Sequence, residues 1–316
     1  MPAVKNSAKE FVPYYVKGYC IRKPLQATNA GNCTWGYAEK FGKEFFIKQF
    51  ITPKFPAPDA DMYESTRKRM VAECEKWYHS HEVVYNAVLN CGGSNLISPM
   101  DFFLEKNTYF LITEKVTSSG VRFTDICKKS EKQQEIIMRV LAHEMACLAK
   151  SNIVHSDLKP ENLILKETVN GFFTVKIIDF DAGFLSSSPP DPDDLTGDQI
   201  YFSPEMLVYF EEEEGEITPK SDVFALGILF HMILCGKMPE FDERYVCLAE
   251  ALLNEEELII SPEIPASYRQ LLRDMLTLQP DERITSEEVF QRLIAKDKKG
   301  AKKKSGLIIK MSGKGY

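Results

Sequence analysis

The chain has 316 residues and a mass of 36.0 kDa, which suggests about two domains and a core that needs neither disulfides nor metal. Hydrophobic residues make up 44% and charged residues 27%, which excludes a largely disordered chain, a collagen and a small disulfide-rich scaffold. The first ten residues contain no apolar stretch, and the longest apolar run, Val223 to Cys235, has only 13 residues. We therefore expect neither a signal peptide nor an integral membrane segment.

The net charge of −7 combines an acidic body with a basic end. Residues 296–316 carry eight lysines and one acid, or +7, so residues 1–295 carry −14. An acidic body does not favour nucleic acid as a partner. We expect the lysine-, glycine- and serine-rich segment 296–316 to be a flexible tail. It either is a solvated end without a role or docks on an acidic surface, its own or that of a partner.

Eight cysteines are spread along the chain without a Cys-x-x-Cys pair or a repeated spacing. This pattern argues against a zinc ribbon and against a disulfide framework. Reduced, mostly buried thiols are typical of cytoplasmic proteins, so we expect a cytoplasmic location.

The N-terminal part has β-type patterns in five stretches: Tyr14–Leu25, Trp35–Phe41, Glu44–Phe50, Phe102–Glu105 and Thr108–Glu114. Gly42 predicts a tight turn between the second and third stretches, and Lys106-Asn107 joins the last two into another hairpin. The intervening segment, Asp61 to Cys91, has no Gly or Pro and predicts one long helix or two abutting helices.

Helical patterns dominate the remainder of the chain. Ser130 to Gln133 reads as a capping box before an amphipathic helix, and Pro204 to Ala295 is largely helical. Short β-type runs at Leu163–Leu165 and Phe172–Ile178 lie between them. This order predicts an α+β protein with a small β-rich part and a larger α-helical part, connected near residues 113–120.

A compact polar cluster lies between apolar runs in IVHSDLKPENLIL, residues 153–165, and VKIIDFDAGF, residues 175–184. Lys159 follows Asp157 by two residues, Asn162 follows three later, and Asp179 comes 22 residues after Asp157. Phosphoryl transfer needs a carboxylate near the attacking hydroxyl, a cation on the moving phosphoryl group, and oxygen ligands for Mg²⁺. The four residues together offer these parts.

This stretch resembles the catalytic and metal-binding loops of eukaryotic-type protein kinases. The resemblance implies that Asp157 is the catalytic carboxylate and that Lys159 steadies the phosphate. It also implies that Asn162 and Asp179 bind ATP through Mg²⁺, as metal ligands, and that His155 is structural.

Residues of the first part continue the resemblance. Lys48, on the predicted third strand, matches the phosphate-binding lysine, and Glu82 matches the helical glutamate that pairs with it, with Glu75 as a fallback. Thr113 to Val116 resembles the adenine-binding hinge, so Glu114 and Val116 are candidate nucleotide contacts together with Gly31 of the phosphate loop.

The implied fold is bilobal. Residues 1–115 would form an N-lobe with a five-stranded sheet, a long helix and an insertion, and residues 116–295 a helical C-lobe. Ser203-Pro204-Glu205, Asp222 and Arg283 match family landmarks of the C-lobe, and Arg283 is expected to form a buried ion pair with Glu205.

The sequence departs from the family in four places. Leu25 to Gly31 retains only the last glycine of the phosphate loop, and Ser156 replaces the arginine that usually grips an activation-loop phosphate. Asp181 replaces the glycine of Asp-Phe-Gly, where it would bind Mg²⁺ directly or indirectly, or face solvent. Asp198 stands at a frequent threonine position, from which its carboxylate would pair with Lys159.

The insertion between Lys48 and Glu82, residues 49–81, contains the basic run Arg67-Lys68-Arg69. We interpret this run as a solvated helix face, with a regulatory docking surface as the alternative.

The leading hypothesis is an ATP- and Mg²⁺-dependent protein kinase that phosphorylates Ser or Thr of a protein substrate. One alternative is a pseudokinase or scaffold, motivated by the eroded glycine loop, Asp181 and Asp198. The other is a small-molecule kinase of the aminoglycoside phosphotransferase type, whose loops resemble residues 155–157 and 178–183.

Overall fold

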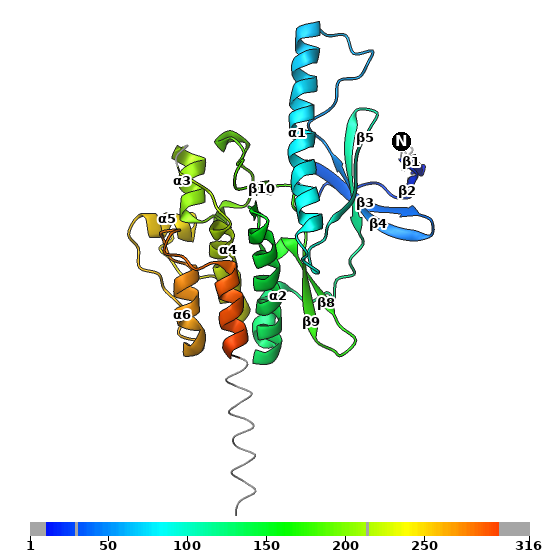
Figure 1. Cartoon of the computed structure of the whole chain (residues 1–316). Helices are drawn as coiled ribbons and strands as arrows, with labels where there is room; N and C mark the ends of the chain where they lie inside the picture. Colours follow the sequence, from blue (N-terminus) through cyan, green and yellow to red (C-terminus); the bar gives the residue numbers. More distant parts are fainter. Residues whose placement is uncertain (1–10, 29–30, 213–214, 297–316) are drawn as a thin grey trace, which may run out of the picture. The chain divides into compact units, whose positions relative to one another are not determined.

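The computed structural model describes residues 11–28, 31–212 and 215–296. The chain divides into two compact units, Met1–Val83 with Ile97–Thr117 and Val84–Leu96 with Ser118–Tyr316 (Figure 1). The sequence predicted that the boundary between the two lobes lies between residues 115 and 116. Residues 84–96 group with the second unit, where Asn95 O accepts a hydrogen bond from Ile177 N at 2.9 Å.

The first unit is built on an antiparallel sheet with the strand order β1-β2-β3-β4-β6-β5. The strands are β1 (Tyr14–Val16), β2 (Tyr19–Ile21), β3 (Cys33–Lys40), β4 (Lys43–Phe50), β5 (Pro99–Glu105) and β6 (Thr108–Glu114). The sheet thus has six strands where five were predicted. The extra strand arises because the chain turns at Lys17 and Gly18, whose φ angles are 45° and 81°.

Both predicted hairpins are present. The β3–β4 hairpin turns at Phe41-Gly42 and pairs Trp35 with Lys48, and the β5–β6 hairpin turns at Lys106-Asn107. One face of the sheet carries the core of this unit, in which Ile21, Ile47 and Ile112 are fully buried. The side chains of Trp35 and Lys48 therefore lie on the opposite face, because neighbouring residues of a strand point to opposite sides.

A single helix, α1 (Glu64–Asn90), occupies most of the stretch for which one or two helices were predicted. Trp77 and Tyr78 pack on Phe102 and Tyr109 of the sheet, with ring centroids 4.8–5.8 Å apart.

The interpretation of Arg67 as a solvated residue is wrong. Its guanidinium donates to the carbonyls of Ala57 at 2.8 Å and Ala60 at 2.9 Å. Since these carbonyls belong to the loop before α1, Arg67 holds this part of the insertion against the start of the helix. Lys68 and Arg69 pair with acids one helical turn away and remain exposed.

The second unit is mainly helical, as predicted for the α-rich part. Its helices are α2 (Glu131–Lys150), α3 (Pro204–Glu212), α4 (Lys220–Cys235), α5 (Leu248–Leu253), α6 (Ala266–Met275) and a final segment over residues 286–296. Residues 221–234 of α4 are all buried, and α4 runs beside α2 and α6 (Figure 1). A helix that is apolar on all sides is expected at the centre of a core.

Short strands and 3₁₀ turns connect these helices. The strands form two antiparallel ladders, β7 (Ile153–Val154) with β10 (Phe184–Leu185) and β8 (Leu163–Glu167) with β9 (Phe173–Ile177). The turns are η1 (Phe123–Lys128), η2 (Pro160–Asn162), η3 (Pro192–Asp194) and η4 (Gln199–Tyr201). The predicted α+β class is confirmed.

The predicted capping box of α2 is only half formed. Ser130 Oγ accepts from Gln133 N at 3.4 Å, as predicted. The Gln133 side chain, however, donates to Phe173 O at 2.9 Å and accepts from Phe173 N at 2.8 Å. It therefore joins α2 to β9 instead of closing the box.

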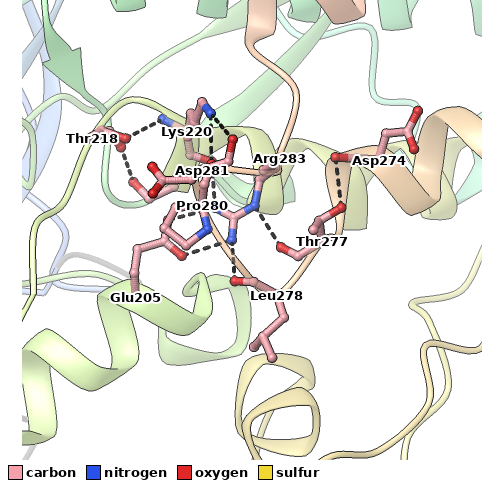
Figure 2. A network of polar contacts seen from close by, with 10 residues as sticks. Glu205, Thr218, Lys220, Asp274, Thr277, Leu278, Pro280, Asp281 and Arg283 are labelled. Carbon is pink, nitrogen blue, oxygen red and sulfur yellow. Dashed lines mark hydrogen bonds and ion pairs between the residues drawn. The ribbon is translucent and has the colours of Figure 1, made fainter.

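Arg283 is buried at the centre of a polar network near the start of α3 (Figure 2). Its Nη1 and Nη2 donate to the two carboxylate oxygens of Glu205 at 2.7 and 2.9 Å, which confirms the expected ion pair. The other guanidinium N–H groups donate to the carbonyls of Thr277, Lys220 and Leu278. All five donors of the guanidinium are thus satisfied, as a buried arginine requires.

Among the described residues, no helix is both long and apolar enough to cross a membrane.

Candidate active site

The loop that carries the candidate catalytic residues lies between β7 and β8 and is held by Asp222 of α4. The Asp222 carboxylate accepts the N–H of His155 at 2.8 Å and that of Ser156 at 3.1 Å. Burial raises the pKa of Asp222 above its usual range, while the two hydrogen bonds act in the opposite direction. These bonds fix Ser156 in a left-handed conformation, φ 68°, so that the chain turns into Asp157.

Asp157 is the centre of the site, because each of its carboxylate oxygens has a defined partner. Oδ1 accepts from Lys159 Nζ and from Asp198 N, both at 2.9 Å. Oδ2 accepts from Asn162 Nδ2 at 2.8 Å, and the same amide reaches Asp157 O at 2.7 Å. These bonds hold the carboxylate in one orientation, as a group that must meet a substrate hydroxyl needs to be held.

Asn162 and Asp179 lie at one end of the β8–β9 hairpin. The Asn162 carbonyl accepts from Ile178 N at 3.0 Å, and Ile178 directly precedes Asp179. Asp179 has φ 67°, an uncommon conformation for a residue other than glycine. His155 supports this turn, since its Nε2 lies 3.2 Å from Ile178 O and its ring centroid lies 4.9 Å from that of Phe180.

The amide oxygen of Asn162 and the carboxylate of Asp179 are ligands that suit Mg²⁺. An amide that donates through Nδ2 keeps its oxygen for a cation, and Asp179 supplies a carboxylate. Within residues 11–28, 31–212 and 215–296, no group of three or more His, Cys, Asp or Glu side chains could hold a metal ion. Mg²⁺ does not need such a group, because it commonly takes one or two carboxylates and completes its shell with phosphates and water.

Asp198 contacts Lys159, as the sequence predicted. Its Oδ2 lies 3.9 Å from Lys159 Nζ, its N–H binds Asp157, and its Oδ1 caps the η4 turn by accepting from Ile200 N at 3.2 Å. Lys159 therefore lies between two carboxylates. Burial raises the pKa of nearby Tyr201, and the charges of Glu161 and Asp198 add to the effect.

Asp181 has a partner that sequence reasoning did not identify. Its Oδ1 accepts a hydrogen bond at 2.7 Å from the hydroxyl of Tyr85, in the last part of α1. Because Tyr85 and Asp181 are 96 residues apart and belong to no shared motif, no local pattern could have indicated the contact.

The structure places Lys48 and Glu82 in the first unit. Lys48 lies on β4, opposite Trp35 of β3 and Leu111 of β6, and is 9% exposed. Glu82 lies on α1, where its carboxylate is 3.9 Å from His79 Nδ1, and Glu75 is exposed on the same helix. The predicted ion pair between Lys48 and Glu82 stays a prediction.

The remaining candidates also belong to the first unit. Gly31 has φ 51°, in a loop whose ends are joined by two hydrogen bonds between Gln26 and Trp35 at 2.7 and 2.9 Å. Residues 29–30 of this loop lie outside the described residues. Glu114 is the last residue of β6, opposite Phe45, and Val116 comes two residues later. Their nucleotide contacts likewise stay predictions.

Comparison with known proteins identifies the family. The protein kinase domain model matches residues 64–293, well over half of the chain, and the chain therefore belongs to the protein kinase family. This confirms the resemblance that was drawn from residues 153–165 and 175–184.

Several relatives bear protein kinase names. A calcium/calmodulin-dependent serine/threonine-protein kinase of Malus domestica is 30% identical over 62% of this chain and 47% of its own length. Protein kinase kin1 of Schizosaccharomyces pombe is 25% identical over 87% of this chain and 30% of its length. The phosphorylase b kinase gamma catalytic chain, liver/testis isoform, of Homo sapiens is 27% identical over 63% of this chain and 50% of its length. The chain thus spans half or less of these curated relatives.

Proposed function

We propose that the chain is an ATP- and Mg²⁺-dependent protein kinase that transfers the γ-phosphate to a Ser or Thr hydroxyl of a protein substrate. The observation that carries the proposal is the position of Asp157, whose carboxylate is oriented by Lys159, Asn162 and Asp198 N. Family membership and relatives named as serine/threonine kinases support it.

Each residue of the site has a separate role in the proposed transfer. Asp157 orients the acceptor hydroxyl and takes its proton as the hydroxyl oxygen bonds to the γ-phosphorus and the bond to the ADP oxygen breaks. Lys159, within 2.9 Å of Asp157, is placed to steady the transferred group. Asn162 and Asp179 would hold Mg²⁺, which when bound neutralises charge on the phosphates.

The pseudokinase alternative rests on a specific feature, the position of Lys159 between two carboxylates. A cation already paired with Asp157 and Asp198 offers less charge to a phosphoryl group than a cation with one such neighbour. The small-molecule kinase alternative lacks such support, because the Glu205–Arg283 pair belongs to the landmarks of protein kinases.

Transfer from labelled ATP to a generic protein substrate in the presence of Mg²⁺ tests the proposal. Asp157→Ala and Asp179→Ala should each reduce the rate by about 10²–10⁴-fold while leaving the unfolding transition intact. Asp193→Ala, a change of an exposed acid in η3, is the matched control and should leave the rate unchanged. Wild-type transfer by Asp179→Ala would refute the site, and no transfer by the wild-type protein would favour the pseudokinase.

Location and partners extend the proposal. We propose a cytoplasmic location, because the eight cysteines, all among the described residues, form no disulfide. The acidic partner of the basic tail is also a proposal, since residues 297–316 lie outside the described residues.

A further inference from the structure

Lysine side chains lie over aromatic rings at one end of the second unit. The Lys129 ammonium, just after η1, lies 4.9 Å from the ring centroid of Phe173 on β9. The Lys132 ammonium, on the first turn of α2, lies 4.9 Å from the ring centroid of Phe172. Because the face of an aromatic ring attracts a cation, both charges are held in defined positions. We call these four residues the lysine–aromatic surface.

The turn of the β8–β9 hairpin presents an aliphatic side chain to solvent. Val169, in this turn, is fully exposed. Thr168 N and Oγ1 donate to Phe172 O at 2.7 and 2.9 Å, and Gly171 N donates to Thr168 O at 2.9 Å. The Gln133 side chain also holds the backbone of β9 on α2. The hairpin is therefore ordered, and it keeps Val169 in water although burial of an aliphatic side chain is favourable.

The charge of this end differs from that of the body as a whole. Residues 125–132 and 166–176, together with Lys296, carry six lysines and three acids, or +3. Residues 1–295 carry −14. One of the three acids, Glu131, lies 3.3 Å from Lys296 Nζ, so its charge is offset locally. An acidic protein thus has a basic end beside an exposed valine.

The basic segment of the chain begins at the same end. The start of α2, the turn of the β8–β9 hairpin and the end of the helical segment 286–296 lie together at the lower end of the second unit (Figure 1). Lys296 contacts Glu131 and Glu135 of α2 at 3.3 and 3.2 Å. Residues 297–316, which follow it, add seven lysines and the apolar run Leu307-Ile308-Ile309 to the sequence.

We propose that the lysine–aromatic surface and the hairpin turn dock on the surface of an anionic lipid membrane, with the lysines against the headgroups and Val169 inserted beneath them. Clustered lysines are attracted to anionic lipids, and an apolar side chain beside them anchors the contact. A projecting turn suits a soft surface that it can enter, whereas a peptide usually binds in a groove or along a strand edge. Acidic charge elsewhere on the body is screened beyond about 8 Å at physiological salt. This inference goes beyond the proposed function and does not depend on it.

Sedimentation with vesicles tests the lysines. The full-length protein is mixed with phosphatidylcholine vesicles that contain about 30% phosphatidylserine, at about 0.1 M salt. Lys129→Gln combined with Lys132→Gln should lower the partition coefficient by about 10- to 30-fold, because each lysine near such a surface contributes about fivefold. Lys150→Gln combined with Lys237→Gln removes the same charge from lysines 68% and 44% exposed elsewhere on the unit. This control should stay within about twofold of wild type.

Tryptophan fluorescence tests insertion of the hairpin turn. Vesicles of the same composition but with brominated acyl chains quench a tryptophan that reaches them. The emission of Val169→Trp should fall on binding, relative to wild type with its two native tryptophans. Val246→Trp is the matched control, since Val246 is a valine 70% exposed between α4 and α5, and it should respond as wild type does. Val169→Asp should also lower the partition coefficient by about tenfold, and Val246→Asp by no more than about twofold.

Equal partitioning of the two glutamine double variants would overturn the proposal, as would quenching of Val169→Trp that does not exceed that of Val246→Trp. Soluble poly-glutamate represents the rival partner, an acidic protein. If the Lys129 and Lys132 variant loses affinity for poly-glutamate while Val169→Trp shows no quenching by vesicles, the surface binds an acidic protein and the lipid proposal is wrong.

Phosphate transfer to a soluble substrate without vesicles separates this proposal from the proposed function. The Lys129 and Lys132 variant should keep its rate within about twofold of wild type, because both lysines lie outside the catalytic loop. Loss of membrane binding with normal transfer in this variant is the expected result. If wild type transfers phosphate but fails both vesicle tests, only the docking proposal is wrong, and if it binds vesicles but transfers no phosphate, only the proposed function is wrong.

Discussion

Ser156 Oγ donates a hydrogen bond to the main-chain carbonyl of Thr196 at 3.0 Å, and so joins the catalytic loop to the segment that precedes α3. Further contacts hold the same segment. Phe184 pairs with Val154, Leu195 is buried in an apolar cluster, and Asp198 N binds Asp157. Contacts within the chain therefore hold the segment before α3 in place. In the family, an arginine that binds a phosphate on this segment commonly has that role.

We expect activity without phosphorylation of residues 185–198. Alanine at Ser186, Ser187, Ser188 and Thr196 should leave phosphate transfer within about threefold of wild type, because the Thr196 carbonyl is retained. Ser156→Ala is the comparison, since loss of one hydrogen bond should slow transfer by up to about tenfold. Phosphatase treatment before the assay checks the expectation. Activity that is lost on treatment and returns only when Thr196 is phosphorylated again would contradict it.

The buried Arg283–Glu205 pair should contribute strongly to stability. Arg283→Met leaves the Glu205 carboxylate buried without its partner, and the free energy of unfolding should fall by about 3–5 kcal/mol. Arg244→Met is the matched control, because the Arg244–Asp242 pair has the similar distance of 3.0 Å but side chains 70% and 41% exposed. Denaturant titration should show a loss below about 1 kcal/mol for the control. Equal losses in the two variants would contradict the argument.

His231 should make stability depend on pH. Its Nδ1 lies 2.7 Å from Lys237 O and its Nε2 accepts from Ser261 N at 3.1 Å, so both ring nitrogens are used by the neutral ring. Burial lowers the pKa of His231 below its usual value, and the charge of Lys237 adds to this effect. Below about pH 6.5, His231 of the unfolded chain binds a proton more readily than the same residue in the folded chain. Acidification should therefore lower the free energy of unfolding by up to about 1.4 kcal/mol per pH unit.

Denaturation at pH 7.5 and 5.5 measures this effect. His231→Gln supplies a donor and an acceptor that do not ionise, and its stability should fall less on acidification than that of wild type. His79→Gln, which changes a side chain 76% exposed, should behave as wild type. The variants must be compared with wild type because Asp222 also affects the pH dependence. Burial raises the pKa of Asp222, so its protonation favours the folded state as the pH falls, which opposes the effect of His231. Equal pH dependence of wild type and His231→Gln would exclude the role.

Lys296 is the one residue of the predicted basic tail that belongs to the described residues. Lys296, the first residue of the predicted tail, is described and lies 3.2 Å from Glu135 Oε1 and 3.2 Å from the ring centroid of Tyr268. Deletion of 297–316 should therefore leave stability unchanged, whereas Lys296→Met in the shortened chain should lower it by about 1 kcal/mol. Thermal unfolding of the two proteins checks the difference, and equal stability would place Lys296 with the tail.

The tail itself stays a functional prediction. Its deletion should leave ATP turnover within a few-fold and weaken binding to an acidic partner at low salt, with the difference fading above roughly 0.2 M. Identical binding and rates of the two proteins at low salt would show that the segment has no such role.

Much of the local structure could be predicted because its causes are local. Glycine at position 42 and the alternating residues beside it predict the β3–β4 hairpin, and the helix-forming run from residue 61 predicts α1. Local patterns also misled. The sequence indicated that Arg67 is one of three surface cations, but its guanidinium binds the carbonyl of Ala57 in the loop before α1. The sequence likewise indicated that the Gln133 side chain closes the cap of α2, but it binds the backbone of β9.

The sequence by itself was enough to identify the kinase loops, because Asp157, Lys159 and Asn162 lie close together in one short stretch of the chain. Only the tertiary structure decided what holds these residues. Asp198 reaches Asp157 across 41 residues, Tyr85 reaches Asp181 across 96, and Arg283 reaches Glu205 across 78. The physical reason is that propensity and periodicity act between neighbours in the chain. A hydrogen bond between distant residues depends instead on how the elements pack, which no short window of sequence specifies.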